Sequence, residues 1–217
     1  MLKTILFDND GVLVDTEPLF FEANRWMLRK FGAELPEKDF ADISLVQGRS
    51  VAGILVDMGF TPLFAEQARE ERNAKYDQML RERGKSLVIP GVPEVLETLH
   101  RNFRIGVVTC CAERHFQTIH EASGLSRFFD FVVKGEEFAH HKPHPEPYLL
   151  ALKRSSSAPG ECIAVEDSQR GVQSARAAGL CVAAIPRGIS QNGNFDSATW
   201  VLSGIRDLIP LIRRISS

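Results

Sequence analysis

Short apolar runs alternate with helical patterns over most of this chain. Five runs predict buried strands because each is uninterrupted and ends at polar or turn-forming residues. They lie at residues 4–7, 105–108, 131–133, 162–165 and 182–185. Apolar positions at helical spacing predict helices between them, at residues 93–99, 146–153 and 169–178. Strands that alternate with helices favour an α/β fold built on a doubly wound, Rossmann-like parallel sheet.

One long stretch departs from this alternation. Between residues 16 and 86 no run is typical of a strand, and glycines punctuate a series of predicted helices. These helices lie at residues 19–31, 39–45, 51–58 and 63–83. The charge-dense residues 66–83 are interpreted as a solvent-exposed helix face. The pattern predicts a sheet domain from residues 1–15 and 87–217, with residues 16–86 inserted as a helical cap. Two linkers that enter one module form a natural hinge.

Composition narrows the class of protein. Of 217 residues, 44% are hydrophobic and 25% charged, as in an ordinary globular protein. The net charge of −2 gives no electrostatic reason to expect a nucleic acid or an acidic membrane as a partner. No apolar run approaches the ~20 residues of a membrane-spanning helix. The four cysteines form no C-x-x-C pair, which favours reduced thiols and the cytoplasm. No interface signal stands out, so we expect a monomer.

Acidic residues follow two of the predicted strands. Asp8 and Asp10 come directly after the first run, and residues two apart in an extended segment face the same side. Glu166 and Asp167 follow the fourth run. Because parallel strands end at a common edge, these carboxylates are expected to gather there. Crowded carboxylates need a cation, and oxygen ligands suit Mg²⁺.

Groups that suit a phosphate accompany these acids. Thr109 ends the second run, and its hydroxyl and the following amides could hold phosphate oxygens. Lys142 lies in a loop that prolines stiffen. A carboxylate such as Asp8 is already ionised near neutral pH and needs no base to act as a nucleophile.

Four segments, taken together, resemble the haloacid dehalogenase-like hydrolase superfamily, and within it the β-phosphoglucomutase-like phosphatases with a helical cap. In chain order they are FDNDGVLVDTE at residues 7–17, VVT at 107–109, KPHP at 142–145 and VEDS at 165–168. A single D-x-D is weak evidence, but four motifs in the family's order span most of the chain.

The resemblance implies a role for each acid. Asp8 would attack phosphorus and form an aspartyl-phosphate. Asp10 would protonate the leaving oxygen and then take a proton from the hydrolytic water, which requires a raised pKa. Mg²⁺ would be bound by the Asp8 carboxylate, the Asp10 backbone carbonyl and Asp167. Glu166 would be a further ligand or an outer partner.

The resemblance also implies substrate contacts. Thr109, the backbone around Cys110, and Lys142 would hold the transferred phosphate. Thr16 resembles a hinge or site-edge residue, although a helix cap is an equally good interpretation. Arg49 resembles a cap arginine that contacts the distal part of the substrate, with an exposed surface residue as the alternative.

These features predict an Mg²⁺-dependent phosphomonoester hydrolase that acts on a small phosphorylated metabolite, such as a sugar phosphate. The alternative is a β-phosphoglucomutase-type phosphosugar mutase. Mutases of this kind carry a histidine twelve residues after the nucleophile, where this chain has Phe20. Carbon–halogen hydrolysis is disfavoured because that reaction has no role for Asp10. A catalytically inactive binding module is disfavoured because it would be expected to lack one of the acids.

Overall fold

A computed structural model describes residues 1–216 of the chain, and these contain one six-stranded parallel sheet. The strand order is β3-β2-β1-β4-β5-β6, so the order changes direction between the central strands β1 and β4. The strands are β1 (Thr4–Phe7), β2 (Arg104–Val108), β3 (Phe131–Val133), β4 (Cys162–Glu166), β5 (Cys181–Ala184) and β6 (Trp200–Val201). The five predicted strands are confirmed to within one residue at each end, whereas β6 was not predicted.

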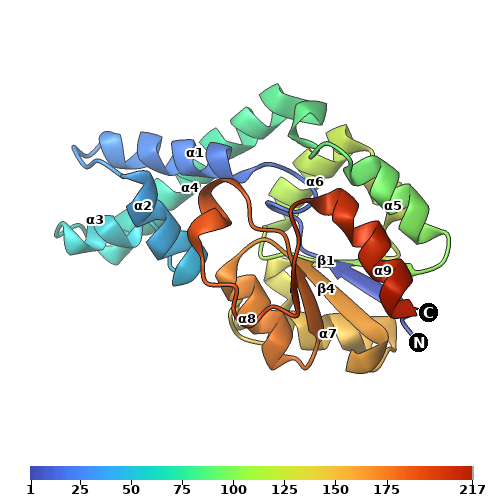
Figure 1. Cartoon of the computed structure of the whole chain (residues 1–217). Coiled ribbons are helices and arrows are strands. Elements are labelled where there is room, and N and C mark those ends of the chain that lie inside the picture. The colour runs from blue at the N-terminus through green and yellow to red at the C-terminus, as the bar shows by residue number, and fades with distance from the viewer. Residues whose placement is uncertain (217) are drawn as a thin grey trace.

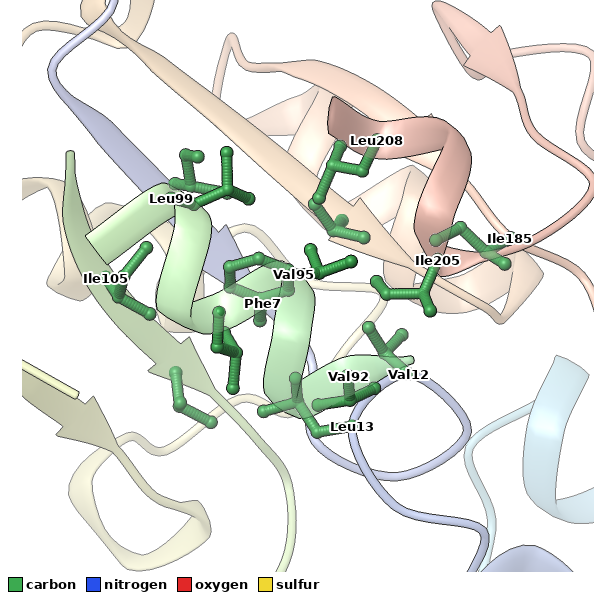
Figure 2. Close-up of a cluster of buried hydrophobic side chains, with 14 of the residues drawn as sticks. Phe7, Val12, Leu13, Val92, Val95, Leu99, Ile105, Ile185, Ile205 and Leu208 are labelled. Carbon is green, nitrogen blue, oxygen red and sulfur yellow. The ribbon is translucent and has the colours of Figure 1, made fainter. Parts of the chain in front are cut away.

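Helices cover both faces of the sheet (Figure 1). One face carries α5 (Val92–His100) and α9 (Leu208–Ser216), and the other carries α7 (Glu146–Ser155) and α8 (Gln169–Ala177). Side chains of β1 alternate between the two clusters: Phe7 packs in the first and Leu6 in the second. Figure 2 shows Phe7 and Ile105 beneath α5. Burial on both faces explains why these strands are apolar throughout.

A run of helices lies between β1 and β2. It contains α1 (Glu17–Arg29), α2 (Glu37–Phe40), a π-helical turn (Ala41–Val46), α3 (Gly53–Asp57) and α4 (Pro62–Arg83). We call residues 16–86 the helical segment. It has an apolar cluster of its own, and it lies to one side of the sheet in Figure 1. The predicted helices are present, although the one at residues 39–45 is divided between α2 and the π-helical turn.

The two linkers of the helical segment lie side by side. Val14 and Val88 form an antiparallel bridge. The backbone N–H of Asp15 donates to the carbonyl of Leu87 at 2.8 Å. The segment therefore leaves and rejoins the sheet at one place, next to the carboxyl end of β1.

The charged helix α4 is 22 residues long. The interpretation of residues 66–83 as a solvent-exposed face is correct for one side only, because a buried stripe runs along the other. The stripe consists of Ala65, Ala68, Arg72, Asn73, Tyr76 and Leu80. Within residues 1–216, neither this helix nor any other has the length and apolar character to cross a membrane.

Candidate active site

The carboxyl ends of β1, β2 and β4 bring the predicted polar residues to one edge of the sheet. The backbone N–H of Asp8 donates to the carbonyl of Val165 at 2.9 Å, so Asp8 continues the pairing of β1. Thr109 continues β2 in the same way through the carbonyl of Val133. After Asp8 the chain turns sharply at Gly11, whose φ of +78° is readily adopted only by glycine.

A cavity of about 250 Å³ opens over this edge, between the sheet and the helical segment. The wall on the sheet side is formed mainly by Asp8, Asp10, Cys110, Lys142, Asp167 and Arg170. The opposite wall is formed mainly by Glu17, Phe20, Phe40, Arg72, Asn73 and Tyr76. A cavity of this size holds a small metabolite and not a macromolecule.

Lys142 contacts two of the buried carboxylates at once. Its Nζ donates to Asp8 Oδ1 at 2.9 Å, to the carbonyl of Val108 at 2.8 Å and to Glu166 Oε1 at 2.7 Å. Burial lowers the pKa of Lys142, but the Asp8 and Glu166 carboxylates more than offset this, so the pKa is raised. The ammonium group is therefore charged at neutral pH and fixed beside Asp8.

Asp10 lies in a different environment from Asp8. Thr16 donates a hydrogen bond to Asp10 Oδ1, and Thr109 donates to Oδ2 at 3.3 Å. Burial, together with the charge of Asp8, raises the pKa of Asp10. A raised pKa is what a carboxyl group needs in order to deliver a proton.

Glu166 is completely buried and fully hydrogen-bonded. Its Oε1 accepts from the hydroxyl of Tyr148 at 2.6 Å as well as from Lys142. Its Oε2 lies against the first turn of α8, where a Cβ on Gly171 would come within 1.9 Å. Glycine at residue 171 is therefore required for the carboxylate to fit. Burial and the nearby Asp8 raise the pKa of Glu166.

Asp167 occupies a similarly tight position. Its Oδ2 accepts from the hydroxyl of Ser190 at 2.8 Å. A Cβ on Gly11 would come within 2.1 Å of the same oxygen. The Asp167 carboxylate is thus held close to the turn at Gly11 that follows Asp8. Burial, followed by the charges of Glu17 and Asp8, raises the pKa of Asp167 well above its usual range.

The remaining predicted residues lie at different distances from the cavity. Thr16 is at the N-cap position of α1, but its side chain caps no backbone amide and contacts Asp10 instead. Cys110 and Cys111 both line the cavity, and burial raises the pKa of the Cys111 thiol well above its usual range. Arg49 is exposed, donates to Gln47 Oε1 at 3.3 Å, and is not among the cavity-lining residues. The structure does not bring it to the site.

Several cavity residues were not identified from the sequence. Glu17 stands in the quoted first motif without a role, and burial, together with Asp10, raises its pKa to about 8. Arg170 lies in the first turn of α8, a position that could have been flagged because it follows the strand end at Asp167. Arg72 could have been found by extending the spacing of the small and apolar residues along α4.

Comparisons with known proteins agree on one family. The family profile described as haloacid dehalogenase-like hydrolase matches residues 5–185. A phosphorylated carbohydrates phosphatase of Thermotoga maritima is 32% identical over 184 residues, which cover 82% of this chain and 82% of that protein. A phosphoglycolate phosphatase of Nitrosospira multiformis is 32% identical over 197 residues, covering 88% and 86%. The crystal structure of β-phosphoglucomutase from Clostridium difficile superposes with a TM-score of 0.83 at 22% identity, covering 99% and 97%.

Proposed function

Because this chain belongs to the haloacid dehalogenase-like hydrolases and is a phosphatase, we propose that it is an Mg²⁺-dependent phosphomonoester hydrolase for a small phosphorylated metabolite. The observation that supports this most directly is that the two aspartates lie in different environments. Asp8 contacts the buried ammonium of Lys142, whereas burial raises the pKa of Asp10. Phosphorylated sugars and phosphoglycolate, on which the related phosphatases are named as acting, are the expected substrate types.

The acids at the sheet edge fit a divalent cation. Oxygens of Asp8, Glu166 and Asp167 all lie within 4.8 Å of one another, and all three side chains are buried. Both oxygens of Glu166 are already engaged, which favours Asp8, Asp167 and the Asp10 carbonyl as ligands and Glu166 as an outer partner. When bound, Mg²⁺ would neutralise charge on the transferred phosphoryl group.

The two aspartates divide the chemistry between them. A carboxylate oxygen of Asp8 attacks phosphorus, the phosphorus–oxygen ester bond breaks, and Asp10 gives its proton to the departing oxygen. Asp10 then accepts a proton from the water that attacks the aspartyl-phosphate, which releases inorganic phosphate and restores Asp8. Lys142, Thr109 and the backbone at Cys110 would hold the phosphoryl oxygens during both steps.

Net hydrolysis is favoured over a mutase reaction. Phe20 lines the cavity from α1, and its ring can neither accept nor donate a proton. The likeness to β-phosphoglucomutase is a likeness of fold at 22% identity. The mutase alternative predicts isomerisation of a hexose 1-phosphate without release of phosphate.

The organisation proposed from the sequence is kept as part of this function. Residues 16–86 would act as a cap that covers the substrate, while residues 1–15 and 87–217 carry the reacting groups. We further propose that the protein acts as a monomer in the cytoplasm.

Steady-state hydrolysis of p-nitrophenyl phosphate tests the proposal. We expect activity that requires Mg²⁺, is lost with EDTA, and falls below detection in Asp8→Asn. Mass spectrometry after a quench in acid should detect one added phosphoryl group in the wild-type protein and none in Asp8→Asn. A folded wild-type protein that is inactive on a broad panel of phosphate esters would refute the proposed reaction.

A further inference from the structure

The cavity wall that the helical segment forms carries a further charged group, Arg72. Arg72 projects from α4 and is 6% exposed. Its guanidinium carbon lies 4.5 Å from the centre of the Phe20 ring, and its Nη1 donates to Asn24 Oδ1 at 3.3 Å. Its Nε is buried and has no hydrogen-bond partner. A buried guanidinium with an unused donor is a strong site for an anion.

The positive charge of Arg72 is only partly offset by neighbouring groups, since Glu70 raises its pKa less than burial lowers it. Glu66 and Glu70 lie on the same helix, but they form ion pairs with Arg69 and Arg114. Within residues 1–216, no carboxylate forms an ion pair with Arg72. Burial, together with the charge of Arg69, lowers its pKa to about 10, so it remains charged at neutral pH. A bound anion would therefore be the direct ion-pair partner of this guanidinium.

Arg170, the cavity arginine on the sheet side, behaves differently. Arg170 also has a buried Nε without a hydrogen-bond partner, but it lies on the sheet side among Asp8, Glu166 and Asp167. Burial lowers its pKa, and the charges of Cys110 and of these three carboxylates more than offset this effect, so the pKa is raised. The negative charges on the sheet side thus compensate Arg170, whereas no carboxylate within residues 1–216 forms an ion pair with Arg72.

We propose, on the basis of the proposed phosphatase function, that the substrate carries a second anionic group, a phosphate or a carboxylate, which Arg72 binds. Phe20 holds the guanidinium from one face, so its donors are presented to the cavity in a fixed plane. The side chain that stands where a mutase has a catalytic histidine is thus a platform for substrate recognition. Asn73 and Tyr76, next to Arg72 on the same stripe, line the cavity beside it.

Two matched substrate pairs test this assignment, each differing in one anionic group. Fructose 1,6-bisphosphate is compared with fructose 1-phosphate, and phosphoglycolate with 2-hydroxyethyl phosphate. We expect the wild-type kcat/KM to be at least tenfold higher for the doubly anionic member of one pair, and the preferred pair identifies the group as phosphate or carboxylate. Arg72→Gln should bring this ratio close to 1, a loss of about tenfold or more, because it removes a buried charged contact.

The controls separate recognition from folding and from overall charge. Arg81→Gln removes an exposed arginine from the same helix and should keep the wild-type ratio. Arg72→Lys retains the charge and should restore part of the ratio, even if Arg72→Gln melts at a lower temperature. Equal kcat/KM within both pairs, or a ratio that Arg72→Gln does not change, would overturn the assignment while leaving phosphatase activity intact. Failure to hydrolyse any of the four esters or p-nitrophenyl phosphate would instead refute the proposed function.

Discussion

Replacement of Lys142 by methionine is the most direct test of how the buried charges are balanced. Methionine has a similar length and fills the space without a charge. The change removes three hydrogen bonds of 2.7–2.9 Å, to Asp8, Glu166 and the carbonyl of Val108. It leaves two buried carboxylates without their common cation.

The expected loss of stability follows from this burial. Removing one partner of a buried ion pair costs about 3–5 kcal/mol, because the other partner stays buried and uncompensated. That is a large part of the ~5–15 kcal/mol that stabilises a typical domain. Lys38→Met, which removes an exposed lysine, should change the free energy of unfolding by less than about 0.5 kcal/mol.

The loss should depend on pH in a defined direction. Burial already raises the pKa of Glu166 above 4.5, and without Lys142 the pKa rises further. Between the pKa of Glu166 in the unfolded chain and its higher pKa in the folded variant, only the folded variant holds the proton. The stability of the variant therefore falls as the pH rises through this interval. The deficit relative to wild type should therefore be smaller at pH 5.5 than at pH 8.

Urea unfolding followed by circular dichroism, with EDTA present, measures this deficit at both pH values. The double variant Lys142→Met with Glu166→Gln should regain part of the stability, because the uncompensated carboxylate is gone. A deficit below about 1 kcal/mol, or one that grows toward acid pH, would refute this account of the charge balance.

Two further predictions concern metal affinity and acid stability. Gly11→Ala places a Cβ 2.1 Å from Asp167 Oδ2 and should weaken Mg²⁺ binding by at least about tenfold in calorimetric titration. Gly32→Ala meets no atom within 4 Å at a similar φ of +76°, so it should leave the affinity for Mg²⁺ unchanged. Burial lowers the pKa of His120 to about 4. Because only the unfolded chain protonates this residue between pH 6.5 and 4, wild type should lose about 2 kcal/mol between pH 7.5 and pH 5 through it. His120→Gln should lose correspondingly less in urea unfolding, and an equal loss in the variant would contradict the assignment.

The sheet and its acidic edge could be predicted because the signals are local. An apolar run followed at once by an acid marks the end of a buried strand, as at Asp8 and Glu166. Their convergence then follows from parallel topology alone. The strand β6 gave no such signal, because its two residues are placed by pairing with Ala183 and Ala184.

The far wall of the cavity could not be predicted in the same way. Arg72 was hidden in a charged stretch, and only the packing of α4 against α1 decides which of its charges is buried. Arg49 shows the opposite case, since a motif suggested a substrate contact and the loop that carries it leaves the side chain exposed. Such positions depend on how helices pack, which local spacing does not determine.

The paired linkers at Val14 and Val88 have a consequence for how such a protein diversifies. Because the helical segment begins and ends at neighbouring points, its length and sequence do not set the spacing of β1 and β2. The entropy lost on closing a long loop changes only slowly with its length. An exchange of the whole segment at this base would thus leave the strand register intact. Under the proposed function, substrate preference and reaction chemistry would then change independently in evolution, because the two parts are connected only at Val14 and Val88.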